Sequence, residues 1–169
     1  MSMSRKRHGG RTTAVVLIVA VALTISTPAA VASTSSAADP MHLSRLETLV
    51  FRMPIGDFTR IASRPAGADS TFDWSTDHCS APLVGSTGRS FDFTAACARH
   101  DFAYRNYKRA DAANSRRGRV WNSRTRHRID LQFQRDMSNH CSQRAVADRP
   151  TCLLWGELFF RLVRVAGGP

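Results

Sequence analysis

The chain has 169 residues and a formal net charge of +11, and 43% of its residues are hydrophobic. This length suffices for one compact domain with its own core, so no second domain is required. The excess of arginine and lysine favours anionic partners such as nucleic acid, anionic lipid or acidic polymers. It also serves solubility, however, so charge alone selects no partner.

The first part of the chain has the organisation of a secretory signal peptide. Basic residues between Arg5 and Arg11 precede an apolar run, residues 14–23, and small residues follow it. The run is far shorter than the roughly 18 residues that a membrane span requires. We therefore predict that residues 1–32 are a signal peptide cleaved after Ala32, and that the protein is exported from the cell.

The mature chain is expected to form a single domain. Residues 33–40 are rich in serine and alanine and are predicted to be a flexible N-terminus, whereas residues 41–169 are predicted to be the domain itself. The signal peptide carries four lysines and arginines and no acidic residue, so the mature chain stays basic after cleavage.

Four cysteines lie in the mature part, and export to an oxidising space makes two disulfides the expected state. They are Cys79, Cys97, Cys141 and Cys152. Sequence alone allows three pairings. The local one, Cys79 with Cys97 and Cys141 with Cys152, would close short loops and stabilise the fold by about 3 kcal/mol for each disulfide. A zinc site is disfavoured because the cysteines do not occur in close C-x-x-C pairs.

The first part of the domain shows two short helical patterns. Apolar residues at three- and four-residue steps predict a helix over 41–51, and Phe58 and Ile61 indicate a second one before a loop at 64–69. Four aromatic residues then alternate with acids and hydroxyls and are predicted to anchor an irregular, ligand-bearing loop to the helix after it. These residues are Phe72, Trp74, Phe91 and Phe93.

Three longer helices are predicted after this loop. The first covers residues 95–109 with Thr94 as its N-cap, the second covers 123–139, and the last covers 152–165. The basic segment 116–119 is predicted to be an exposed turn between the first two. With no convincing strand pattern in the sequence, we expect an all-α fold.

The first of these long helices carries a polar stripe. Cys97, His100, Asp101 and Tyr104 follow at i, i+3, i+4 and i+7, which places them on one face of a helix. A stripe this polar is poorly suited to a core, so we interpret it as a catalytic wall with a base beside a metal ligand. Asp130 lies at the edge of the apolar stripe of the next helix, where a solvated carboxylate is the simpler interpretation.

Three segments together resemble the secreted phospholipases A2 of bacteria and fungi in order and spacing. They are FDWSTDHC at 72–79, ACARHDFAYRNY at 96–107, and the residues from Arg128 to Cys141. The resemblance covers roughly residues 70–160. It implies a small all-α domain on two long antiparallel helices that carry a catalytic His and Asp, stapled by two disulfides. It also implies calcium-dependent hydrolysis of the sn-2 acyl ester of glycerophospholipids.

The resemblance assigns catalytic roles that the chemistry of ester hydrolysis supports. His100 would be the general base that takes a proton from water, and Asp130 would bind the far ring nitrogen and stabilise the imidazolium. The resemblance therefore favours a catalytic role for Asp130 over its interpretation as a solvated carboxylate. Tyr104 would orient this pair, or else pack under the pocket. The cysteines would be structural, with Cys79 to Cys97 tying the calcium loop to the catalytic helix.

The resemblance also assigns a calcium site. Its ligands would be the carboxylates of Asp77 and Asp101 and the main-chain carbonyl of His78, an all-oxygen set of the kind that a hard cation prefers. A transition metal would instead need the imidazole of His78 as a ligand. His78 departs from the family pattern, which has a small or aliphatic residue there, but a carbonyl ligand tolerates any side chain.

The expected partner is a phospholipid membrane or micelle interface, with a monomeric protein and no nucleic acid. Arg105, Lys108 and Arg109 extend the first long helix as a solvated face or, alternatively, as a contact for anionic lipid. The main rival function is a non-catalytic basic protein that binds membranes or polyanions on the same fold. A nuclease is a weaker rival because it leaves the three matching segments unexplained. Binding alone would need no base and no carboxylate partner.

Overall fold

The structure is a computed structural model that describes residues 39–64, 70–78, 91–114 and 117–166, all within one compact unit of residues 34–169. The described elements are α1 (Pro40–Glu47), the π-helical turn η1 (Thr48–Arg52), α2 (Ile55–Ala62), α3 (Thr94–Ala112), α4 (Ser123–Ser142), the 3-10 turn η3 (Val146–Asp148) and α5 (Arg149–Ala166). No β-strand occurs in these ranges, so the predicted all-α fold is confirmed. The predicted signal peptide lies outside them and stays a prediction.

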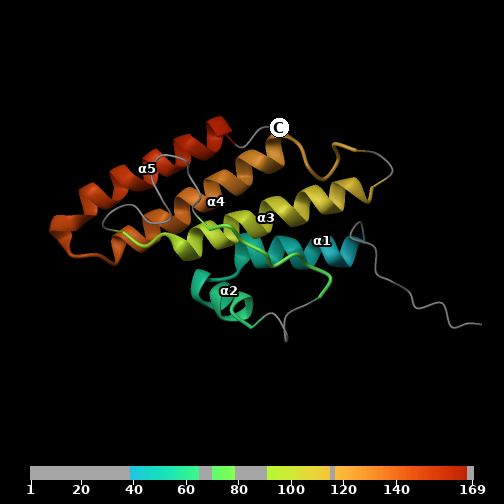
Figure 1. Cartoon of the computed structure of the whole chain (residues 1–169), viewed down its shortest axis with the longest axis horizontal. Coiled ribbons are helices and arrows are strands. Elements are labelled where there is room, and N and C mark those ends of the chain that lie inside the picture. The colour runs from blue at the N-terminus through green and yellow to red at the C-terminus, as the bar shows by residue number, and fades with distance from the viewer. Residues whose placement is uncertain (1–38, 65–69, 79–90, 115–116, 167–169) are drawn as a thin grey trace, which may run out of the picture. The chain divides into compact units, whose positions relative to one another are not determined.

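The three long helices form the frame of the domain. Figure 1 shows α3, α4 and α5 side by side, with successive helices running in opposite directions, and α1 and α2 next to α3. The two long antiparallel helices predicted from the sequence are therefore α3 and α4. Among the helices of the described ranges, none combines the length and the apolar character needed to cross a membrane.

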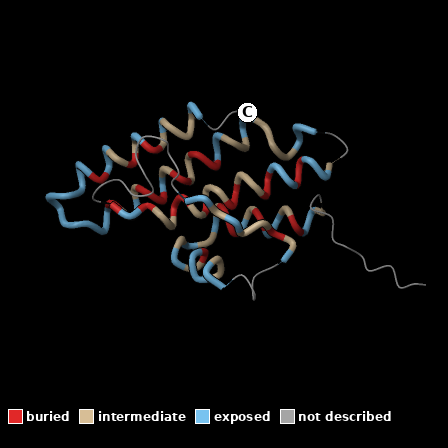
Figure 2. The backbone as a smooth tube through the Cα atoms, viewed as in Figure 1, coloured by how far each residue is buried: buried red, intermediate tan, exposed pale blue. Residues whose placement is uncertain are grey.

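The core has two parts, and α3 contributes to both of them (Figure 2). The first part joins the start of α3 to α4 and α5, and its buried residues are Phe91, Phe93, Ala96, Cys97, Phe133, Met137, Cys141, Cys152 and Phe159. The second joins the rest of α3 to α1, η1, α2 and α4 through Leu46, Leu49, Val50, Phe58, Phe72, Phe102, Ala103, Tyr107 and Ile129. Because buried residues along its whole length pack into one or the other part, the orientation of α3 is fixed.

The four predicted aromatic anchors divide between these two parts. Phe72 and Trp74 pack on Phe102 of α3, with ring centroids 5.5 and 4.5 Å away, as predicted. Phe91 and Phe93 are buried in the other part, where Phe93 lies 5.8 Å from the ring of Phe159. The described segments before α3, residues 70–78 and 91–93, thus pack on α3 and on α5.

Three helix starts differ from their predictions, and the largest difference is in α5, which begins at Arg149 and not at residue 152. The α1 helix begins at Pro40, one residue early, because Asp39 caps it by accepting a hydrogen bond from the N–H of Met41 at 2.8 Å. The prediction of Thr94 as an N-cap is wrong. Thr94 is the first helical residue of α3 and Phe93 occupies the N-cap position, while the N–H of Thr94 donates to the Asp92 carboxylate at 2.9 Å.

The connection between α3 and α4 is fixed by one carboxylate. Asp111 accepts hydrogen bonds from the N–H groups of Gly118, Val120 and Trp121 at 2.9, 2.9 and 3.2 Å. Gly118 has a φ of 83°, a left-handed conformation that glycine adopts without a steric penalty. The predicted turn at 116–119 is therefore present from residue 117 onward; residue 116 lies outside the described ranges.

One predicted disulfide is confirmed. Cys141 at the end of α4 is bonded to Cys152 in the first turn of α5, with a Cα–Cα distance of 5.5 Å. Both residues are buried. The other predicted partner, Cys79, lies outside the described residues, so its pairing with Cys97 stays a prediction.

Candidate active site

His100 of α3 and Asp130 of α4 form a hydrogen-bonded pair across the two long helices. The Nε2 atom of His100 lies 2.9 Å from Oδ1 of Asp130. The side chain of Asp130 is fully buried, and 10% of the His100 side chain is exposed. Within the described part of the chain, no hydrogen bond is formed by the other ring nitrogen, Nδ1. The Asp130 carboxylate thus holds Nε2 of His100, and Nδ1 stays available to a ligand.

Two aromatic rings hold the imidazole of His100 in place. The ring of Tyr104 lies 4.3 Å away, centroid to centroid, and the ring of Phe133 lies 4.8 Å away. Tyr104 comes from the next turn of α3, whereas Phe133 comes from α4. Because the imidazole is packed between residues of both helices, its ring plane is set before any substrate binds.

Tyr104 is also part of the hydrogen-bond network of the pair. Its hydroxyl donates to Oδ1 of Asp130 at 2.7 Å, and Arg126 Nε lies 3.3 Å from the same hydroxyl. Burial, with the hydrogen bond to Asp130, raises the pKa of Tyr104 above its ordinary value. The phenol therefore keeps its proton and acts as a donor to the carboxylate.

Two arginines complete the surroundings of Asp130, and sequence reasoning missed both. Arg164 Nη1 donates to Asp130 Oδ2 at 2.8 Å, while Arg126 Nε lies 3.7 Å from the same oxygen. Burial of Asp130 opposes its ionisation. The hydrogen bonds from His100, Tyr104 and Arg164 outweigh burial, so the pKa of Asp130 lies below its ordinary value.

A second group of acidic residues lies where the loop before α3 meets that helix. Asp101 Oδ2 accepts hydrogen bonds from the Thr76 hydroxyl at 2.6 Å and from the N–H of Asp77 at 3.2 Å. Burial is the main cause that raises the pKa of Asp101 to about 6, and the neighbouring Asp77 carboxyl adds to it. The side-chain interaction with Asp101 in turn holds the pKa of Asp77 below its ordinary value.

Two of the predicted ligand residues, Asp77 and Asp101, are thus neighbours at the junction of the loop and α3. His78 follows directly with a φ of 56°, in the left-handed region where glycine is favoured, and its N–H donates to the Thr76 hydroxyl at 2.9 Å. The described ranges contain no group of three or more His, Cys, Asp or Glu side chains that would hold a metal ion. The predicted set contains only two carboxylates, with a main-chain carbonyl as third ligand. These oxygen donors suit a hard cation such as calcium.

The predicted basic face of α3 is partly engaged within the protein. Arg105 Nη2 lies 3.4 Å from Asp77 Oδ1. The Lys108 ammonium lies over the rings of Tyr104 and Trp121, at 5.4 and 5.0 Å from their centroids. A role of this face in lipid contact stays a prediction.

A buried ion pair lies next to the site, and sequence reasoning missed it as well. Arg99 of α3 donates to Asp136 of α4 through Nε, at 2.9 Å, and through Nη2. Its Nη1 donates to the main-chain carbonyl of Met53 at 2.6 Å, and Gln132 donates to Asp136 at 3.0 Å. This pair joins α3, α4 and the segment before α2 directly beside His100.

The helical frame, the hydrogen-bonded His–Asp pair and the neighbouring carboxylates are together the features that the sequence resemblance leads one to expect of a helical hydrolase. The model of the prokaryotic phospholipase A2 family matches residues 46–167 of the chain. The chain therefore belongs to this family, and it is an enzyme of the phospholipase A2 class.

Two fungal proteins are similar to the chain over most of its length. A secretory phospholipase A2 of Beauveria bassiana is 32% identical over 143 residues, which cover 83% of this chain and 68% of the relative. A secretory phospholipase A2 of Arthroderma benhamiae is 30% identical over 154 residues, which cover 89% of this chain and 95% of the relative. Both bear the name expected from the resemblance of the sequence.

Proposed function

We propose that this protein is a secreted, calcium-dependent phospholipase A2 that hydrolyses the sn-2 acyl ester of glycerophospholipids to a lysophospholipid and a fatty acid. The observation that carries the proposal is the hydrogen bond of 2.9 Å between His100 Nε2 and the fully buried carboxylate of Asp130. Family membership and the names of the two fungal relatives support the substrate class and export from the cell.

The proposed chemistry begins with proton transfer at His100. Since Nε2 is bound to Asp130, a water molecule would give its proton to Nδ1 as its oxygen attacks the ester carbonyl. The resulting imidazolium would be stabilised by the ionised carboxylate of Asp130, whose pKa is held low by its donors. His100 would then return the proton to the leaving alkoxide, so no covalent intermediate forms.

Tyr104 has a supporting role in this scheme. Because its raised pKa keeps the phenol protonated, its hydroxyl donates to the same oxygen of Asp130 that binds His100. The two donors would fix the rotation of the carboxylate and hence the direction of its bond to the imidazole.

The proposed calcium ligands are the carboxylates of Asp77 and Asp101 and the main-chain carbonyl of His78. When bound, calcium would supply positive charge for the developing oxyanion of the ester. Asp101 follows His100 directly in α3, so one helix would hold the base and one of the ligands. The Thr76 hydroxyl and the Asp77 N–H would orient the Asp101 carboxylate.

The proposed partner is a phospholipid membrane or micelle surface, with the protein acting outside the cell as a monomer and without nucleic acid. The mature chain stays basic after loss of the four lysines and arginines of the predicted signal peptide, and a basic protein is suited to anionic lipid surfaces.

The test is an assay of the purified mature protein on phosphatidylcholine that carries different fatty acids at sn-1 and sn-2. We expect calcium to be required and only the sn-2 acid to be released, and a chelator to abolish nearly all release until calcium is restored. Equal release with and without chelator would contradict the calcium dependence. Vesicle binding without release of any fatty acid would instead favour the non-catalytic membrane-binding function.

A further inference from the structure

The end of α5 contacts the carboxylate of the His–Asp pair. Arg164 lies in the last turn of this helix, and its Nη1 donates to Asp130 Oδ2 at 2.8 Å. His100 and Tyr104 both contact the other oxygen, Oδ1. Among the described residues, Arg164 is therefore the one that makes a hydrogen bond to Oδ2, because Arg126 Nε lies 3.7 Å away, beyond hydrogen-bond distance.

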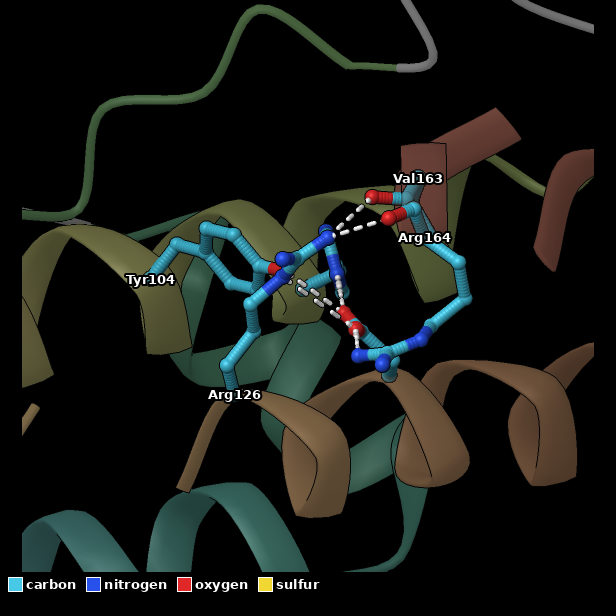
Figure 3. A network of polar contacts seen from close by, with 6 residues as sticks. Tyr104, Arg126, Val163 and Arg164 are labelled. Carbon is cyan, nitrogen blue, oxygen red and sulfur yellow. Dashed lines mark hydrogen bonds and ion pairs between the residues drawn. The ribbon is translucent and has the colours of Figure 1, made fainter. Parts of the chain in front are cut away.

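Arg126 holds this end of α5 in place. Its Nη2 donates to the carbonyl oxygens of Val163 and Arg164 at 3.2 and 2.5 Å. Figure 3 shows the Arg126 guanidinium reaching from α4 to these carbonyls on one side and toward Tyr104 on the other. Because α5 ends at Ala166, both carbonyls belong to the last turn, which lacks intrahelical donors and attracts cations.

Arg126 and Arg164 differ in the exposed fraction of their side chains, and we therefore infer different roles for them. The side chain of Arg126 is 11% exposed and makes its hydrogen bonds within the protein, whereas that of Arg164 is 36% exposed and reaches Asp130 from the surface. Arg126 thus fixes where the backbone of residue 164 lies, and this position lets the Arg164 side chain reach the buried carboxylate.

Loss of the Arg164 guanidinium would leave Oδ2 of a fully buried carboxylate without its hydrogen bond. An unpaired buried oxygen is costly, so the carboxylate would turn toward the remaining cation, Arg126. Such a rotation would move Oδ1 away from the line of its bond to His100. The direction of that bond therefore depends on a residue that does not touch the imidazole.

We propose that Arg164 and Arg126 are positioning residues for the His100–Asp130 pair, and that the C-terminal end of α5 is part of the catalytic apparatus. The inference rests on the proposed function, in which His100 is the base. It assigns Arg164 the task of orienting Asp130 and Arg126 the task of placing Arg164.

The primary test compares Arg164→Gln and Arg164→Lys with a control, Arg161→Gln, in the phosphatidylcholine assay with calcium. Arg161 lies one turn earlier in α5, is 75% exposed and pairs with Glu157. We expect Arg164→Gln to lower kcat by about tenfold, the loss of one charge-assisted hydrogen bond, with KM changed by less than about twofold. The lysine variant should recover part of kcat, and the control should match the wild type.

A double-mutant cycle tests whether Arg164 acts through Asp130. In an Asp130→Asn background, Arg164→Gln should change kcat by less than about twofold, because the carboxylate that it orients is gone. The thermal unfolding midpoint of Arg164→Gln should lie below that of Arg161→Gln, because the buried Oδ2 of Asp130 loses a hydrogen bond. Both variants should still unfold well above the assay temperature, which excludes general loss of folding as the cause of the lower kcat.

The outcomes separate this inference from the proposed function. A wild-type protein that releases no fatty acid would overturn the function. An active wild type with a fully active Arg164→Gln variant would overturn the inference alone. Equal losses from Arg164→Gln in the presence and absence of the Asp130 carboxylate would also overturn it, since Arg164 would then act elsewhere.

Discussion

Two buried aspartates of α4 each bind one of two consecutive residues of α3, and the two pairs differ in the type of residue that the carboxylate binds. Asp136 binds Arg99 through two contacts, and both side chains are 3% exposed. Asp130 binds His100, whose side chain is 10% exposed. Arginine is the residue type that proteins use for fixed ion pairs, whereas histidine is the one that they use most often for proton transfer.

Under the proposed function, the same two helices carry one pair that stabilises the fold and one pair that takes part in catalysis. Arg99 donates hydrogen bonds to Asp136 and to the main-chain carbonyl of Met53. The ion pair therefore connects α3, α4 and the segment before α2. His100 uses one nitrogen on Asp130 and makes no hydrogen bond through Nδ1 within the described residues. A fixed charge therefore holds the helices together one residue away from a group that is left able to react.

Removal of the His100 imidazole is expected to have the largest effect of the changes that test this comparison. We expect His100→Gln to lower kcat/KM by about a thousandfold, within the range attributed to a general base, while the thermal unfolding midpoint changes little. Release of fatty acid and thermal unfolding would both be measured. His127→Gln, the same change at an exposed position of α4, is the matched control and should keep wild-type activity. An active His100→Gln variant would refute the assignment of the base.

The opposite result is expected for the neighbouring ion pair. Arg99→Met leaves the buried Asp136 carboxylate without its cation and should lower the free energy of unfolding by about 3–5 kcal/mol. Denaturant unfolding measures this loss. The double variant Arg99→Met with Asp136→Leu removes both charges and should recover most of the stability. If Arg99→Met were as stable as the wild type, the pair would not be what holds this junction.

The smallest effect is expected at Tyr104, which packs against His100 and also donates a hydrogen bond to Asp130. Tyr104→Phe keeps the ring beside His100 and removes only the hydrogen bond to Asp130, so we expect about a tenfold loss of kcat. Kinetics at saturating substrate and calcium would measure it. Loss of activity as large as in His100→Gln would instead show that the phenol itself takes part in proton transfer.

Much of the fold was predictable because it depends on local pattern. The apolar spacing at Ile129, Phe133 and Met137 places three buried residues on one face of α4, and all three are in the core. The helix ends were less predictable, since Phe93 occupies the N-cap position of α3 in place of the expected threonine. The π-helical turn of η1 has no sequence pattern that would have revealed it.

The site was predictable only in part. Family resemblance pointed to His100 and Asp130, and the structure brings their side chains together. Arg126 stands four residues before Asp130, a spacing that places both on one helix face, and this signal would have found it. Arg164 and the Arg99–Asp136 pair gave no such signal, because the chain has 24 lysines and arginines and sequence does not tell which of them meets a distant carboxylate.

The disulfide between Cys141 and Cys152 also has a consequence for local unfolding. A C-terminal helix is ordinarily among the first elements to fray. Here α5 is held at its start by the disulfide and at its end by the hydrogen bonds of Arg126, so neither end is free to peel away from α4. We therefore expect the amides of α5 to exchange with solvent as slowly as those of α4, as parts of one cooperative unit.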